Sequence, residues 1–149
     1  MTFAVVLLWL FVINLGIAFS AGLYESRVVA PLWASAPPAS LRTPESGLRF
    51  WAIVTTGPLT LLTLASLYFG WQAGGALGAW WLAAAIAALV ERLSTFVYFI
   101  PTMLRLQRST QPTERVGEQF DRWRLFGYGR LTLDVVAWLL AMRALAISG

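Results

Sequence analysis

Charged side chains within otherwise apolar stretches are the residues of this chain best placed to do chemistry. They are three carboxylates and three arginines: Glu25, Arg27, Glu91, Arg92, Arg130 and Asp134. A charge at the centre of a membrane helix costs about 2.5–3.5 kcal/mol on insertion scales, so such residues usually pair inside a bundle. A carboxylate in an apolar site is a stronger base, and a nearby guanidinium can bind an oxyanion through two hydrogen bonds. The candidate catalytic residues are therefore Glu25, Glu91, Arg92, Arg130 and Asp134.

Helical spacing places these charges on shared faces with polar neighbours. The polar stripes are Asn14, Ala21 and Glu25; Glu91, Thr95 and Tyr98; and Arg130 and Asp134. We expect the stripes to converge on one cavity, and at least two of the carboxylates Glu25, Glu91 and Asp134 to pair with Arg92 or Arg130 across helices. The alternative is that the ion pairs only hold the helices together.

Aromatic and polar residues beside the charged stripes are candidate ligand-binding residues. They are Asn14, Thr95, Phe96, Tyr98, Phe99 and Trp123. The three aromatic residues at positions 96–99 would form the wall of an elongated apolar pocket with Glu91 or Glu25 at its polar end. Two alternatives stay open: Asn14 as a helix-packing hydrogen bond, and most tryptophans, including Trp81 and Trp123, as a belt at the membrane interface.

The elements that must position these residues are apolar helices. Of the 149 residues, 58% are hydrophobic and only 12% are charged, against about a quarter charged in a soluble domain. Four apolar runs, at about residues 3–24, 50–71, 76–100 and 127–147, each reach the roughly 20 residues that cross a bilayer. We expect a single four-span domain over residues 1–149, and a retained first helix in preference to a cleaved signal peptide.

The stretches between the spans carry turn and helix-start signals. Pro37-Pro38 should stop a helix, Thr43-Pro44-Glu45 reads as a helix start, and residues 72–75 as a tight turn. The third span should end before Pro101. Val116, Phe120 and Trp123 recur at helical spacing between charged residues, which predicts an amphipathic interfacial helix. The expected fold is all-α: a membrane four-helix bundle with a short amphipathic helix before the last span.

Residue types that are missing limit the chemistry. The chain has no Cys and no His, so thiolate nucleophiles, iron–sulfur clusters, zinc sites with Cys or His ligands and histidine-ligated haem are excluded. We expect neither a metal nor a cofactor. The sequence pI is about 10.3, but the arginines flank apolar spans, where they set topology, so we expect no nucleic-acid partner.

Arginine placement predicts the orientation. The first and third loops carry the arginines, whereas the amino terminus and the second loop carry none. The positive-inside rule places the arginine-rich loops in the cytoplasm and both termini outside.

Three stretches resemble a known group. They are Gly22-Leu23-Tyr24-Glu25 with Ala30-Pro31-Leu32-Trp33-Ala34-Ser35-Ala36-Pro37-Pro38; Thr95-Phe96-Val97-Tyr98-Phe99-Ile100-Pro101-Thr102; and Trp123 followed by Arg130. The chain thereby resembles small bacterial four-helix membrane proteins related to the anthrone-oxygenase-like family. The resemblance implies a bacterial inner-membrane location and a cofactor-free oxygenase acting on lipophilic polycyclic phenols. It highlights Glu25, Tyr98, Trp123 and Arg130.

Two hypotheses of function follow. In the first, the protein binds or transforms a lipophilic small molecule, with Glu25 or Glu91 accepting a proton and Arg92 or Arg130 stabilising the anion. In the second, it is a non-catalytic accessory or scaffold subunit that packs against a membrane protein partner or another copy of itself. Transport is a weaker third idea, because four helices without an evident repeat would need to oligomerise.

Overall fold

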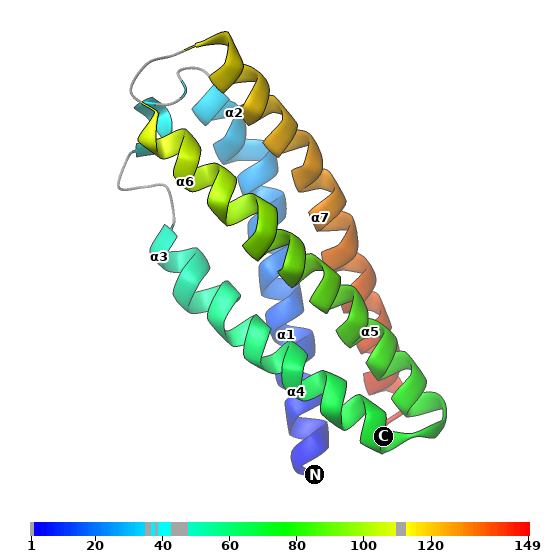
Figure 1. Cartoon of the computed structure of the whole chain (residues 1–149). Helices are drawn as coiled ribbons and strands as arrows, with labels where there is room; N and C mark the ends of the chain where they lie inside the picture. The colour runs from blue at the N-terminus through cyan, green and yellow to red at the C-terminus, as the bar shows by residue number, and fades with distance from the viewer. Residues whose placement is uncertain (1, 35–36, 38, 43–47, 110–112) are drawn as a thin grey trace.

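A computed structural model describes residues 2–34, 37, 39–42, 48–109 and 113–149. The helix start expected at Thr43-Pro44-Glu45 lies outside these residues. Four long helical rods run up and down in an antiparallel bundle (Figure 1). Both chain ends and the turn between the second and third rods lie at one end of the bundle, and the end of the first rod, the end of the third and the start of the fourth lie at the other. The all-α four-helix prediction is confirmed.

Each rod except the last is built from several segments. The first is α1 (Phe3–Tyr24), η1 (Glu25–Val29) and α2 (Ala30–Ala34); the second is α3 (Leu48–Phe50), η4 (Trp51–Thr56) and α4 (Gly57–Ala73). The third is α5 (Gly75–Ser94), η5 (Thr95–Phe99) and α6 (Ile100–Arg108); the fourth is α7 (Glu114–Ala146) alone. A short 3₁₀ turn, η2 (Ala39–Arg42), follows the first rod.

The four rods are long and apolar enough to cross a membrane. In each, only 22–39% of the most apolar 18-residue window is buried inside the bundle. The outward faces carry large apolar side chains such as Ile53, Leu61 and Val97, which are at least 70% exposed. Because water cannot solvate such a surface favourably, these features together indicate a multi-pass membrane protein.

Small residues allow close contact between the second and third rods. A Cβ atom on Gly78 would lie 2.7 Å from the carbonyl oxygen of Gly70, so a larger residue would force the two helices apart. The turn between them, predicted at residues 72–75, contains Gly74 and Gly75 at φ values of 62° and 54°. Glycine adopts this backbone region without the steric cost that other residues meet.

A wide π-helical turn precedes a proline in three of the rods. The N–H groups of Ala30, Gly57 and Ile100 each donate to a carbonyl five residues earlier. The next residue in each case is a proline: Pro31, Pro58 or Pro101. A proline inside an α-helix clashes with the carbonyl four residues before it and donates no hydrogen bond. The wider turn lets the rod continue past the proline.

Two sequence expectations differ from the structure at this level. The third rod does not end before Pro101 but continues to Arg108, because η5 accommodates the proline. The amphipathic segment with Val116, Phe120 and Trp123 is not a separate helix but the first turns of α7. Its glycines weaken a helix without breaking it, and no proline intervenes between Glu114 and Ala146.

A polar layer lies between two apolar clusters inside the bundle. The larger cluster includes Leu8, Phe11 and Ala137 and fills the half near the chain termini. The smaller cluster includes Trp33, Phe120 and Trp123 and fills the arginine-rich end. Glu25 on the first rod, Glu91, Arg92 and Thr95 on the third, and Asp134 on the fourth are buried between residues of the two clusters, and here the candidate site is found.

Candidate functional site

The buried polar layer contains most of the charged residues predicted from sequence. Its buried members are Glu25, Thr55, Glu91, Arg92, Thr95 and Asp134, with Arg130 beside them. Arg27, by contrast, is exposed. The polar stripes of the first, third and fourth rods were predicted to converge, and their charged residues do lie together in this layer.

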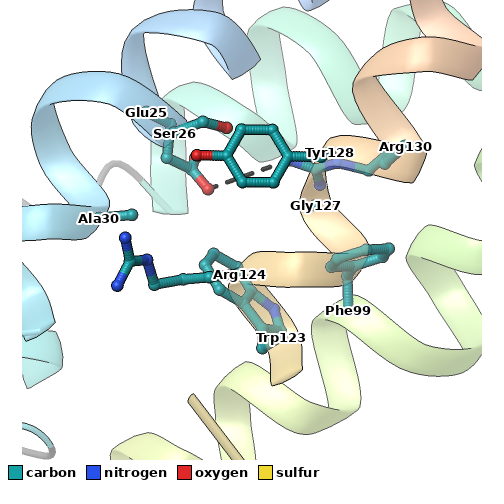
Figure 2. Close-up of a pocket in the computed structure, with 9 residues that line it drawn as sticks. All are labelled: Glu25, Ser26, Ala30, Phe99, Trp123, Arg124, Gly127, Tyr128 and Arg130. Carbon is teal, nitrogen blue, oxygen red and sulfur yellow. Dashed lines mark ion pairs between the residues drawn. The ribbon is translucent and has the colours of Figure 1, made fainter. Parts of the chain in front are cut away.

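Glu25 and Arg130 form an ion pair between the first and fourth rods. An Arg130 Nη2 atom lies 3.9 Å from Glu25 Oε1 (Figure 2). The guanidinium also lies over two rings, 5.6 Å from the Trp51 ring centroid and 4.8 Å from that of Phe99. Such cation–π contacts strengthen when they are shielded from water. Trp51 belongs to the second rod and Phe99 to the third, so this ion pair contacts side chains of all four rods.

Glu91 is held by residues of its own rod. One carboxylate oxygen accepts a hydrogen bond of 2.8 Å from the Thr95 hydroxyl, and the other pairs with the Arg92 guanidinium. The Glu91 side chain is completely buried. With both oxygens engaged, Glu91 fixes the position of Arg92 and is poorly placed to meet a ligand.

Asp134 interacts electrostatically with Glu91, Arg92 and Arg130 without a direct ion pair. Its Oδ1 atom is buried and has no hydrogen-bond partner. Among the described residues, Glu25–Arg130 is therefore the one ion pair between rods in this layer. The expectation of at least two such pairs was wrong, because Arg92 pairs with its sequence neighbour Glu91 instead.

A cavity of about 100 Å³ lies beside the Glu25–Arg130 pair. That volume is several times the roughly 10–15 Å³ needed to hold one water molecule. All four rods contribute to its wall, which is mostly apolar. The lining residues are Glu25, Trp33, Trp51, Thr56, Arg92, Thr95, Phe99, Ile100, Met103, Leu104, Trp123 and Arg130.

Two buried hydrogen-bond donors on cavity-lining residues have no partner among the described residues. They are Nη1 of Arg92 and the indole Nε1 of Trp123. A buried donor left unsatisfied costs about 1–3 kcal/mol, and more when it is charged. Both residues line the cavity, so the two donors are buried beside it. The cavity therefore combines aromatic walls with donors that suit a carbonyl, phenolate or carboxylate oxygen.

The predicted ligand-binding residues divide into two groups. Thr95, Phe99 and Trp123 line the cavity, whereas Asn14, Phe96 and Tyr98 do not. Phe96 is 45% exposed on the outside of the bundle, and Tyr98 packs against Phe126 with ring centroids 5.3 Å apart. The wide turn of η5 directs Phe99 inward and leaves Phe96 outside. Trp123 and Trp81 are buried and do not form part of an interfacial belt.

Asn14 has a structural contact instead. Its Nδ2 donates a hydrogen bond of 3.3 Å to the carbonyl of Val54 in η4. Val54 precedes Pro58 by four residues, so its carbonyl is the one that loses its usual helical donor to the proline. Asn14 supplies that missing hydrogen bond from the neighbouring rod, which agrees with the packing alternative for this residue.

Several cavity residues were missed by sequence reasoning. Trp33, Trp51 and Met103 line the cavity wall but lie in or next to predicted loops and span ends. The prolines that follow the wide turns were the available signal, since each marks a place where a helix departs from α geometry. No three metal-ligating side chains lie together in the part of the chain that the structure describes.

Comparison with models of known families, with curated proteins and with solved structures finds no match to this chain.

Proposed function

We propose that this protein binds a lipophilic small molecule with an oxygen-bearing head in its intramembrane cavity. One observation carries the proposal: the unpartnered donors of Arg92 and Trp123 belong to residues that line a mostly apolar cavity with four aromatic side chains in its wall. Ion pairs that only hold helices together need no cavity beside them. The observation therefore favours ligand binding over a pure scaffold.

The ligand would place its oxygen at the polar end of the cavity. Arg92, held by Glu91, would donate to the oxygen, and Arg130 would add positive charge from the opposite rod. The body of the ligand would lie against Trp33, Trp51 and Phe99. Aromatic walls favour a flat ring system, because stacked rings gain up to about 1.5 kcal/mol beyond the area they bury.

The cavity would be reached from the membrane. Ile100 and Leu104 line it and are 37% and 40% exposed on the outer face of α6. A ligand dissolved in lipid could thus enter without crossing water. We place the protein in the bacterial inner membrane, with both termini outside and the arginine-rich loops in the cytoplasm. The cavity would then open in the inner leaflet.

The chemistry we propose is proton abstraction by Glu25 followed by reaction with oxygen. The resemblance to the anthrone-oxygenase-like family supplies the substrate class, a polycyclic phenol with an acidic ring C–H bond. Glu25 would take the proton, and Arg92 or Arg130 would stabilise the resulting oxyanion. The electron-rich carbanion would react with O₂, giving a quinone and water. No metal is required for the deprotonation.

Binding is tested with anthracene-9-carboxylate, a flat probe with an anionic head, and the detergent-solubilised protein. Quenching of tryptophan fluorescence should saturate. Arg92→Met keeps the unbranched apolar stem of the side chain but removes its donors, so affinity should fall about tenfold for a loss of about 1.4 kcal/mol. Arg108→Met, on the exposed end of α6, should bind as the parent does. No saturable binding, or equal binding by both variants, would favour the scaffold.

Catalysis is tested by oxygen consumption with anthrone. The parent should consume one O₂ per anthrone converted to anthraquinone. Glu25→Gln should bind the probe and lose this activity, while Glu114→Gln, in the exposed first turn of α7, should keep it. Binding without oxygen uptake by the parent would limit the function to ligand binding.

A further inference from the structure

A second, much smaller hollow also lies beside the Glu25–Arg130 pair. Figure 2 shows this hollow, which is formed between η1 and α7. Its volume is about 10 Å³, which is about the space that one water molecule occupies. Its lining residues are Glu25, Ser26, Ala30, Phe99, Trp123, Arg124, Gly127, Tyr128 and Arg130.

Glu25 is the carboxylate that faces both spaces. Four residues line the hollow and the larger cavity alike: Glu25, Phe99, Trp123 and Arg130. Neither Glu91 nor Asp134 lines either of the two. The Glu25–Arg130 ion pair thus borders both the apolar cavity and the water-sized space, with Phe99 and Trp123 beside it.

The two spaces differ in polarity. The residues that line only the hollow include Ser26, Arg124 and Tyr128, and the last of these is 43% exposed. Arg124 also forms an ion pair of 3.7 Å with exposed Asp121, toward the arginine-rich end of α7. The residues that line only the cavity are mainly apolar, such as Trp33, Met103 and Leu104, with Thr56, Arg92 and Thr95 as their polar members. A water molecule in the hollow would therefore have polar side chains around it.

We propose that Glu25 exchanges protons with water through this hollow while it meets the ligand through the cavity. A ligand proton passes to a Glu25 carboxylate oxygen, and then from the carboxyl group to a water molecule in the hollow. The carboxylate is regenerated, and Arg130 remains cationic throughout. The ligand half of this relay rests on the proposed function, but the access of water to Glu25 does not.

The test follows deuterium exchange into the Glu25 carboxyl group by infrared spectroscopy. At acidic pH the carboxyl C=O band of Glu25 is identified by its loss in Glu25→Gln, and its shift in D₂O reports exchange. Gly127→Leu should obstruct the approach to the hollow, because Gly127 lines it and a Cβ atom there lies in open space with no neighbour within 4 Å. Exchange should then be about tenfold slower, equivalent to about 1.4 kcal/mol in the barrier.

Matched control variants distinguish exchange of water through the hollow from exchange through the cavity. Gly117→Leu also adds a side chain to an open position of α7, away from the hollow, and should exchange as the parent does. Met103→Trp narrows only the cavity and should not slow exchange. Ser26→Leu fills the hollow from η1, so it repeats the test if Gly127→Leu does not fold.

The other outcomes decide either against the relay or against the proposed function. Parent-like exchange in both Gly127→Leu and Ser26→Leu, or equal slowing by Met103→Trp, would overturn the relay by placing the water route elsewhere. Failure of anthracene-9-carboxylate to bind, with slow exchange in Gly127→Leu, would reject the proposed function and leave the water route standing.

Discussion

At the scale of single residues, the site depends on which charges are paired and which donors are not. The Arg130 side chain is 13% exposed and contacts Glu25 and the rings of Trp51 and Phe99. Removing one partner of a buried ion pair typically costs about 3–5 kcal/mol, because the other charge stays buried alone. The stability of the bundle should therefore depend strongly on this one arginine.

Arg130→Ala should lower the melting temperature in detergent far more than Arg108→Ala, which removes an exposed arginine. Adding Glu25→Gln to Arg130→Ala should recover part of the loss, since no uncompensated charge then remains. Thermal unfolding of the three variants measures both effects. Equal melting temperatures for the two arginine variants would mean that the Glu25–Arg130 pair is in contact with water or headgroups.

Asn14→Leu should destabilise the protein by about 0.6–1.7 kcal/mol, the range for hydrogen bonds between membrane helices. The reason is the loss of the donor to the Val54 carbonyl. In the background of Pro58→Ala the new backbone N–H can reach that carbonyl, so the effect of Asn14→Leu should shrink. A double-mutant cycle measures this coupling. Additive effects would show that Asn14 does not compensate for the proline.

At the scale of elements, the wide turns bring the cavity residues together. η1 contributes Glu25, η4 contributes Trp51 and Thr56, and η5 contributes Thr95 and Phe99. Each extra residue in a wide turn rotates the rest of its helix by about 100° relative to an α-helix. The prolines that favour these turns are therefore positioning residues for the cavity, although none of them lines it.

Pro101→Ala should preserve the melting temperature, or raise it, yet weaken the binding of anthracene-9-carboxylate by about tenfold. Without the proline, residues 95–99 can return to α geometry, and the cavity-lining residues of α6 rotate away. Pro37→Ala lies outside the helices and should leave binding unchanged. Binding and melting temperature measured together test the idea, which fails if Pro101→Ala binds the probe as tightly as the parent.

At the scale of the whole molecule, the prediction concerns orientation. The chain has no Cys, so a single introduced cysteine reports one position without background. With the arginine-rich loops in the cytoplasm, Ser40→Cys and Ser109→Cys should resist a membrane-impermeant thiol reagent in intact cells, while Gln72→Cys should react. Gln72 is preferable to Gly74, whose positive φ disfavours a side chain. The reverse labelling pattern would invert the orientation.

The sequence places Gln111 in the same loop as Ser109, so it would report the same side of the membrane, but it lies outside the described residues. Labelling after the cells are opened provides the control, because all three cysteines should then react. A cysteine that stays unreactive in opened cells is buried and reports nothing about sidedness.

The sequence alone determined the class of the fold. A long apolar run with few charges can lie in lipid only if its backbone N–H and C=O groups hydrogen-bond to one another, and an α-helix achieves this within one segment. The same reasoning identified the buried charges, because an ionisable residue in an apolar run must turn inward. Glu25, Glu91, Arg92 and Asp134 are indeed buried. These conclusions depend on local composition, which the sequence displays directly.

Only the tertiary structure decided how those charges divide their roles. Regular spacing could not reveal that Arg92 pairs with Glu91, or that Phe96 faces outward while Phe99 faces the cavity. Helical periodicity assumes 3.6 residues per turn, and the wide turns before Pro31, Pro58 and Pro101 break that period. Beyond each wide turn every face is rotated, and the cavity with its unpartnered donors forms where three such rotations meet.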